Sequence, residues 1–426
     1  MKVITSLYLF LFSAMLVAER PPNVIVIMAD DLGAEGLQSY GSTLYTTPHL
    51  DRLAAEGQRY NNAYATPLCT PSRVMIMSGL YPNRTGHMAL MGKGKGSRMS
   101  EKIRTFGNDF QEHGYHTAMA GKWQLGKFED YPEQALEHGF DEHTMWTWFH
   151  GGDKTSRYYN PHIHTNEGFI QGKPEEYGPD YYAKSVLSFI DKNKDDPFFV
   201  YFPMALTHTP FTEPPALVDL ASSRYPEGIE KNARAFGLLI TYMDEIIGKI
   251  MQRLQDLEIA ENTLVIFTAD NGTHKSVKSS LPDMDLQGGK GSLTEAGTRV
   301  PFITWWPGTI KPEVKEEFFC LVDVLPTICS VAGINLNREV DGMDLSHYFT
   351  GEEGQDREYV FMTWKTGSFI REKRFRLNAE GKKSLEYTMY DIPVTSDKER
   401  YGETVTENPE YEQERRRMRG ILYLFA

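Results

Sequence analysis

The residues Cys69-Thr70-Pro71-Ser72-Arg73 place a thiol, two hydroxyls and a guanidinium in one short stretch. The apolar run 74–80 follows at once and predicts a helix that begins near the thiol. Backbone N–H groups and the helix dipole favour an anion at such a position. The pattern therefore indicates anion chemistry beside Cys69. A capped helix in which the cysteine is only a small buried hydrophobe is the alternative.

Two acidic motifs each follow an apolar run that is typical of a buried strand, at 24–29 and 263–269. The side chains that follow these runs are Asp30, Asp31, Asp270 and Asn271. Because ligands collect at the carboxyl ends of parallel strands, we expect these side chains to meet. Their hard oxygen donors favour Ca²⁺, with Mg²⁺ as second choice, over Zn²⁺. Either motif alone is more typical of a turn.

Four basic residues stand in the cysteine motif or near predicted strand ends. They are Arg73, Lys122, His208 and Lys290. Each alone is typical of a solvated charge, since lysine in particular is rarely buried without a partner. Together they could neutralise a bound anion and the charge that develops on a leaving oxygen.

Taken in order, these motifs resemble the type I sulfatases of the alkaline phosphatase superfamily. Besides the cysteine motif, the matching segments are 78–82, 121–123, 208–210, 270–272 and 289–302. The resemblance covers nearly the whole chain after residue 18. It implies an enzyme that hydrolyses sulfate esters, most of all those of a sulfated carbohydrate.

The resemblance also implies roles for the motif residues. A maturation enzyme would oxidise Cys69 to Cα-formylglycine, whose hydrate is the nucleophile and a calcium ligand. The remaining calcium ligands would be Asp30, Asp31, Asp270 and Asn271. Arg73 would steady the hydrate, and Lys122, His208 and Lys290 would bind the sulfate. We expect His208 to be the general acid, because its pKa lies near neutrality and an anionic ester favours its charged form.

Gln124 departs from the family pattern, in which most members have histidine two residues after the lysine of the Gly-Lys-Trp segment. An amide can hydrogen-bond the substrate but cannot act as a base near neutral pH. Either another group takes the proton, or sulfate release limits turnover. Some sulfatases that share this glutamine act on polysaccharides, so we do not interpret it as loss of activity.

Two alternatives remain open at the level of sequence. A related phosphohydrolase would use Thr or Ser with two zinc ions and additional histidine ligands, which are not evident. A non-catalytic binder of sulfated glycans would keep Cys69 as a thiol, and only Gln124 favours it.

The composition limits the function classes. The chain has 426 residues, 40% hydrophobic and 24% charged, with a net charge of −13. It therefore belongs to the soluble globular class, and its charge argues against nucleic acid or an anionic membrane surface as partner. Besides Cys69 it has only Cys320 and Cys329, which we expect to be buried rather than bridged.

Residues 1–18 combine Lys2 with an apolar run and predict a signal peptide. No other stretch is long and apolar enough to cross a bilayer. The sequence thus predicts export to the periplasm or the extracellular space.

Alternating apolar runs and helical patterns predict an α/β fold, a large mostly parallel sheet sandwiched by helices. We expect the catalytic domain over 19–352 and a small C-terminal α+β subdomain over 353–426. The stretch 130–177 has no clean periodicity and is expected to form substrate-recognising loops. In it, 146–150 and 157–159 offer aromatic platforms for sugar rings, and Arg157 offers a cation for a second anionic group, with aromatic packing as the alternative.

Overall fold

The structure is a computed structural model that describes residues 20–92, 97–215, 217, 225, 228–365, 367–381, 385–393 and 401–425. The predicted signal peptide, 1–18, lies outside the described residues and stays a prediction. Among the described residues, none of the helices combines the length and the apolar character that a membrane span requires.

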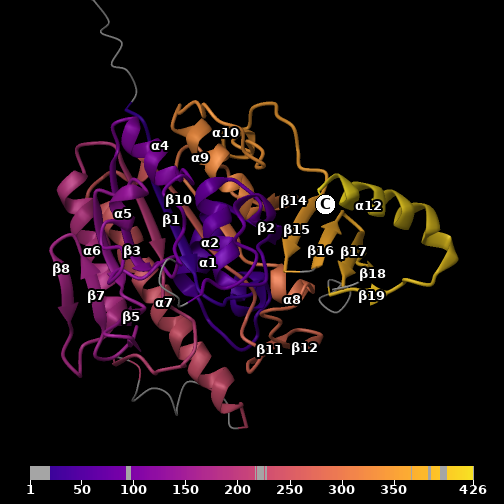
Figure 1. Ribbon diagram of the computed structural model, residues 1–426, viewed down its shortest axis with the longest axis horizontal. Helices are drawn as coiled ribbons and strands as arrows, with labels where there is room; N and C mark the ends of the chain where they lie inside the picture. The colour runs from indigo at the N-terminus through magenta and orange to yellow at the C-terminus, as the bar shows by residue number, and fades with distance from the viewer. Residues whose placement is uncertain are drawn as a thin grey trace, which may run out of the picture.

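A ten-stranded sheet forms the centre of the molecule (Figure 1), in the order β14-β2-β13-β10-β1-β9-β3-β4-β7-β8. Its strands are β1 (Asn23–Ala29), β2 (Gln58–Tyr64), β3 (His116–Lys122), β4 (Glu142–Trp146), β7 (His162–Thr165), β8 (Gly168–Gln171), β9 (Phe198–Pro203), β10 (Thr263–Ala269), β13 (Phe302–Trp305) and β14 (Glu313–Cys320). The five neighbours β10, β1, β9, β3 and β4 run parallel, and β13 and β7 run antiparallel to them. The predicted mostly parallel sheet is confirmed.

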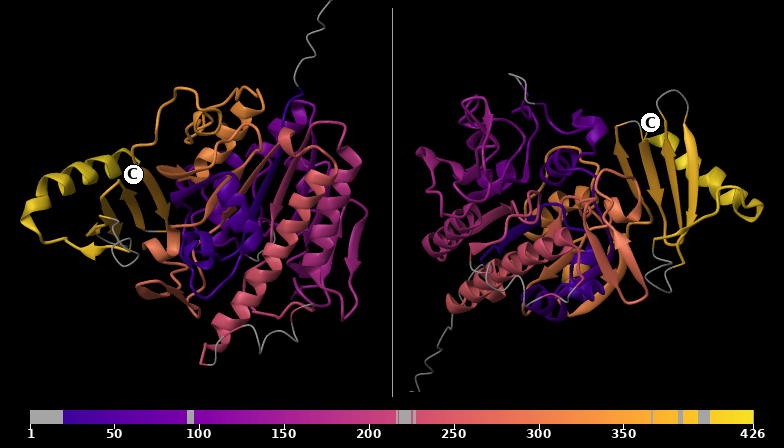
Figure 2. Two further views of the ribbon diagram at one scale, coloured as in Figure 1. Left: turned by 180° about the vertical axis from the view of Figure 1, so that it is seen from behind. Right: turned by 90° about the horizontal axis from the view of Figure 1, so that it is seen from below.

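Helices cover both faces of this sheet. The helices α2 (Cys69–Ser78), α4 (Phe106–Glu112) and α9 (Val324–Val331) contact one another. The long α7 (Lys231–Asp256) contacts α1 (Pro48–Glu56) and α6 (Gly178–Asn193), and α6 and α7 lie side by side in the view from behind (Figure 2). The central strands β1 and β10 are buried at every residue, as their continuous apolar runs require.

Shorter elements connect this framework. The helices are α3 (Pro82–Thr85), α5 (Gln134–Glu137), α8 (Glu295–Thr298) and α10 (His347–Thr350), and the strands are β5 (Phe149–His150), β6 (Asp153–Lys154), β11 (Lys278–Leu281) and β12 (Met284–Gln287). Cys320 and Cys329 are buried free thiols, as expected.

The stretch 130–177 differs from its prediction, because it is not a set of loops. Its strands β4, β7 and β8 continue the large sheet to one edge. They are only four or five residues long, with irregular burial patterns, so no period-2 signal marks them in the sequence. Sheet pairing with β3 rather than local pattern fixes this region.

A separate five-stranded antiparallel sheet lies at the other end of the molecule (Figure 1). Its strands are β15 (Val360–Trp364), β16 (Gly367–Arg371), β17 (Phe375–Glu380), β18 (Glu386–Asp391) and β19 (Glu403–Thr404). The helix α12 (Glu412–Leu424) contacts β16 and β17. A small C-terminal α+β unit is thus confirmed, whereas its boundary at 352/353 stays a prediction.

Candidate active site

The acidic motifs meet because β1 and β10 are parallel neighbours that end in register, Ala29 opposite Ala269. The backbone N–H of Asp31 donates to Oδ1 of Asp270 at 3.1 Å. The amide Nδ2 of Asn271 donates to Oδ1 of Asp31 at 2.9 Å. The structure thus brings together the polar side chains that follow β1 and β10, as the sequence predicted.

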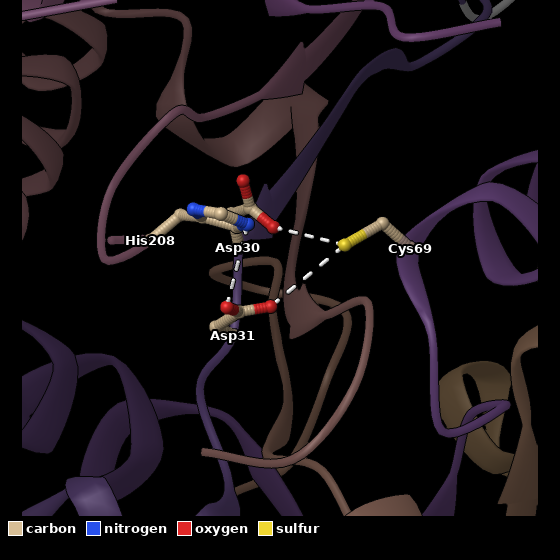
Figure 3. Close-up of side chains that lie close together, drawn as sticks. All are labelled: Asp30, Asp31, Cys69 and His208. Carbon is tan, nitrogen blue, oxygen red and sulfur yellow. Dashed lines mark hydrogen bonds and ion pairs between the residues drawn. The ribbon is translucent and has the colours of Figure 1, made fainter. Parts of the chain in front are cut away.

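Cys69 is the first residue of α2 and only 1% exposed. Its Sγ lies 3.4 Å from Oδ1 of Asp30 and 3.8 Å from Oδ1 of Asp31, so it faces both carboxylates (Figure 3). Ser72 closes the turn before the helix, since its Oγ accepts from the backbone N–H of Thr66 at 3.0 Å. Burial raises the pKa of the Cys69 thiol, and the charge of Asp270 adds to this, so the group is a thiol and not a thiolate.

Arg73 lies about one helical turn after Cys69 and is 1% exposed. Its Nε and Nη2 donate to Oδ2 of Asp270 at 3.1 and 2.7 Å. Its Nη1 donates to the backbone oxygen of Lys122 at 2.7 Å. Arg73 therefore ties α2 to the ends of β10 and β3.

Two lysines face the carboxylates of β1. Nζ of Lys122 lies 2.5 Å from Oδ2 of Asp30, and Nζ of Lys290 lies 2.6 Å from Oδ2 of Asp31. The Lys122 side chain is fully buried and that of Lys290 is 13% exposed. Lysine is buried in this way only when it is paired, so both contacts belong to a built site.

His208 completes the group, with Nε2 at 3.6 Å from Oδ2 of Asp31 (Figure 3). Its Nδ1 lies 2.6 Å from the carbonyl oxygen of Thr209. Because a carbonyl can only accept, Nδ1 carries the hydrogen and Nε2 faces the site. Burial lowers the pKa of His208 to about 3, so the imidazole is neutral near pH 7 without a bound ester, and its charged form beside an anionic ester stays a prediction.

Among the three carboxyls, the pKa values of Asp30 and Asp31 are lowered and that of Asp270 is raised. Burial raises the pKa of Asp30, but the ammonium of Lys122 and the guanidinium of Arg73 outweigh it and hold that pKa well below its usual value. Burial together with the charge of Asp30 raises the pKa of Asp270 to about 6. The ionised form of Asp270 is therefore only partly stabilised by the cations around it at this edge of the sheet.

This arrangement fits a divalent cation. The ligand atoms of Asp30, Asp31, Cys69 and His208 all lie within 4.8 Å of one another. The buried Oδ1 of Asn271 has no hydrogen-bond partner among the described residues. An orphaned amide oxygen beside clustered carboxylates is the donor set of a hard cation.

Gln124 follows β3 with a left-handed φ of 54°. Its buried Oε1 also lacks a hydrogen-bond partner within the described part of the chain. An unpaired buried amide oxygen two residues after Lys122 is free to interact with a ligand.

The aromatic platforms expected at 146–150 are not on the surface. Trp146, Trp148 and Phe149 are at most 5% exposed, so the packing alternative is correct for them. Arg157 is also turned inward, 3% exposed, with Nη1 at 3.3 Å from Oδ2 of Asp30. Its charge was evident from the sequence, but its direction was not.

Tyr158, which the sequence suggested as part of an aromatic platform, is 2% exposed and holds a loop of the site in place. Its hydroxyl donates to the carbonyl oxygen of His208 at 2.6 Å and lies 3.1 Å from that of Ala205. Thr207 holds the same loop to β1, with its N–H donating to the Asp30 carbonyl at 2.7 Å. These bonds fix the loop that presents His208.

The chain is similar in sequence to a known protein family and to individual members of it. The model of the Sulfatase family matches residues 22–334. Human arylsulfatase A is 33% identical over 84% of this chain and 73% of its own length. The N-acetylgalactosamine-6-O-sulfatase of Bacteroides thetaiotaomicron is 28% identical over 80% of this chain and 79% of its length.

Solved structures share the fold. The crystal structure of Ps i-CgsB superposes with a TM-score of 0.77 at 24% identity, covering 88% of this chain and 86% of that one. The putative sulfatase yidJ from Bacteroides fragilis has a TM-score of 0.75 at 22% identity, covering 94% and 93%.

Proposed function

The chain belongs to the sulfatase family and is a sulfuric ester hydrolase, and we propose that it acts on a sulfated carbohydrate through a formylglycine made from Cys69 beside a bound calcium ion. The observation that carries this proposal is the buried Cys69 at the start of α2, facing Asp30 and Asp31. Because the chain belongs to the sulfatase family, the phosphohydrolase alternative is wrong.

The cation would be held by oxygen atoms of Asp30, Asp31, Asp270 and Asn271 together with residue 69. The orphaned Oδ1 of Asn271 and the raised pKa of Asp270 support this assignment, because both groups gain a partner from a cation. When bound, Ca²⁺ supplies positive charge that favours the ionised form of a neighbouring hydroxyl.

Conversion of Cys69 supplies what a thiol cannot. A hydrated aldehyde has two hydroxyls, so one can attack sulfur while the other later loses a proton and releases sulfate. The Sγ atom stands where such a hydroxyl would be. Because Cys69 is 1% exposed, the maturation enzyme must act before the chain folds.

The surrounding residues divide the remaining work. Lys122 and Lys290 bind the sulfate oxygens and offset charge on the leaving group. Arg73 pairs with Asp270 and thereby fixes the start of α2, which carries residue 69, beside the end of β10. His208 gives a proton to the departing alcohol from Nε2. Burial lowers its pKa, so this role needs the bound anionic ester to raise that pKa again.

Gln124 is proposed as a substrate contact and not as a base. Its orphaned Oε1 is an acceptor, which suits a sugar hydroxyl better than a sulfate oxygen.

Two observations support a saccharide substrate. The dog relative that is 32% identical, over 81% of this chain, is named N-acetylgalactosamine-6-sulfatase. A cavity of about 370 Å³ opens beside Lys290, lined among others by Gly291, Trp364 and Tyr390. The half-buried Trp364 lines this cavity, so part of its indole ring is available to contact a sugar.

The predicted leader at 1–18 supports export, and the catalytic domain is proposed to span 19–352. An exported enzyme would meet polymeric sulfated substrates outside the cell, which agrees with the proposed export.

The test is sulfate release from a panel of sulfated monosaccharides and disaccharides by the chain produced with a formylglycine-generating enzyme. We expect one sulfated position to be cleaved and mass spectrometry to show an aldehyde or its hydrate at residue 69. Full activity with an unmodified thiol would refute the mechanism, and activity on aryl sulfates alone would refute the saccharide.

A further inference from the structure

Arg157 is a permanent cation inside the site to which the proposed mechanism assigns no role. It lies between β6 and β7, is 3% exposed, and its Nη1 is 3.3 Å from Oδ2 of Asp30. Nζ of Lys122 lies 2.5 Å from the same oxygen. Two cationic groups from different elements therefore converge on one carboxylate oxygen.

The sheet fixes this convergence. Trp146, the last residue of β4, is the register partner of Lys122 on β3. The guanidinium of Arg157 lies over the Trp146 ring, 4.1 Å from its centroid. The indole face thus supports one side of the guanidinium and directs its edge toward Asp30. The neighbouring Tyr158 is bonded to the His208 loop, which holds the backbone of this segment in place.

The charges at the site call for an anion. Four permanent cations face three carboxylates, and the residues are Arg73, Lys122, Arg157 and Lys290 with Asp30, Asp31 and Asp270. A divalent cation held among the carboxylates would increase this positive excess and would compete with Lys122 and Arg157 for Asp30. The donors of Lys122 and Arg157 converge on one oxygen atom and so face the same small volume.

We propose that Arg157 binds the sulfate group directly, beside Lys122. The proposal rests on the proposed function and adds a residue to its substrate site. A guanidinium presents several N–H donors in a planar fork, and only one of them is needed to reach Asp30. Because it does not titrate, Arg157 contributes binding and charge stabilisation but transfers no proton.

The experiment is calorimetric titration of the calcium-loaded protein with inorganic sulfate, together with elemental analysis of bound metal. Arg157→Met keeps an apolar stem over Trp146 but removes the charge and the fork. We expect it to weaken sulfate binding roughly 10- to 100-fold, as the loss of a charge-assisted bond does, with the metal content unchanged. Arg157→Lys keeps the charge and should lose less.

Arg338→Met is the matched control. Arg338 forms a two-pronged ion pair with Asp109, with both bonds at 2.6 Å, and takes no part in the site. We expect its sulfate affinity to equal that of the wild type. If Arg157→Met does not fold, Arg157→Gln and Arg157→Lys carry the same comparison.

Two results would overturn the proposal. One is wild-type sulfate affinity in Arg157→Met with metal retained. The other is loss of metal and sulfate affinity together, which would make Arg157 a support for the cation site only. A wild type that binds sulfate but hydrolyses no sulfate ester would contradict the proposed function, and the titration would still decide the role of Arg157.

Discussion

Two buried ionic clusters of this protein pair carboxylates with cations, and they differ in how fully their polar groups are satisfied. The active-site cluster comprises Asp30, Asp31, Arg73, Lys122, Arg157, Asp270 and Lys290. The inter-sheet cluster comprises Tyr64, Glu295, Arg371, Arg376 and Asn378. The second cluster joins β2 and α8 to β16 and β17 of the C-terminal sheet.

The inter-sheet cluster satisfies its own polar groups. Glu295 pairs with Arg376 at 2.6 Å and accepts from the Tyr64 hydroxyl at 2.9 Å. Burial raises the pKa of Glu295, but Arg376 and Arg371 outweigh it, so the net shift is downward. At the active site, in contrast, the pKa of Asp270 is raised to about 6 and an amide oxygen is orphaned. Buried polar groups that are all paired within the protein are typical of a structural contact. Buried polar groups without a partner indicate a site that binds a ligand.

The largest expected effect is at Cys69. Cys69→Ala should lower activity at least about 1,000-fold, since the nucleophile is lost, and leave the melting temperature nearly unchanged. Steady-state assays and a thermal melt measure both. Activity that persists in this variant would remove residue 69 from the mechanism.

Asp270→Asn tests the active-site cluster. We expect the bound calcium to be lost and activity to fall by about 100-fold or more, because the variant removes a ligand charge and releases Arg73. Elemental analysis and sulfate-release assays check this. The variant also breaks the buried Arg73–Asp270 ion pair, so the unfolding free energy should fall, but by less than in Glu295→Gln, because the pKa of Asp270 is raised and that of Glu295 is lowered. Stoichiometric zinc with no calcium in the wild type would contradict the metal assignment.

Glu295→Gln is the counterpart in the inter-sheet cluster. It leaves Arg376 and Arg371 without their carboxylate, and a broken buried ion pair costs about 3 to 5 kcal/mol of unfolding free energy. Urea unfolding should show this loss, while the folded fraction keeps its calcium and its kcat. A variant as stable as the wild type would mean that the cluster does not fasten the C-terminal sheet.

Asp270 and Glu295, one from each cluster, should also contribute oppositely to the pH dependence of stability in the metal-free protein. A raised folded pKa gives Asp270 a stabilising contribution at low pH that is lost as pH rises from about 4 to about 6, of about 3 kcal/mol at most. The lowered pKa of Glu295 gives a contribution that is present above its unfolded pKa and lost on further acidification. Unfolding of the wild type, Asp270→Asn and Glu295→Gln across pH 3 to 7 separates the two.

The smallest expected effect is at the cavity beside Lys290. Trp364→Ala should raise KM for a sulfated saccharide about tenfold, since a stacking face is removed, without changing KM for a small aryl sulfate. Tyr423→Ala, an exposed aromatic on α12, is the control. Equal loss on both substrates would place Trp364 outside the sugar site.

The sequence was sufficient wherever a local pattern carries the information. Continuous apolar runs marked β1 and β10, and their polar ends marked the edge at which Asp30 and Asp270 meet. Thr47, Pro48 and Gly57 are typical helix start and stop residues, and they stand at the two ends of α1. These signals are short-range, because burial on both faces and helix termination act on neighbouring residues.

Tertiary structure alone decided which charged and aromatic groups turn inward. Arg157 lies at Asp30 because β4 pairs with β3 and carries Trp146 beneath the guanidinium. The aromatic residues near it pack because short strands without a sequence period extend the sheet. The pKa of His208 falls because the loop held by Tyr158 is buried. Direction, burial and pairing across distant segments are properties of the assembled sheet, and no window of the sequence contains them.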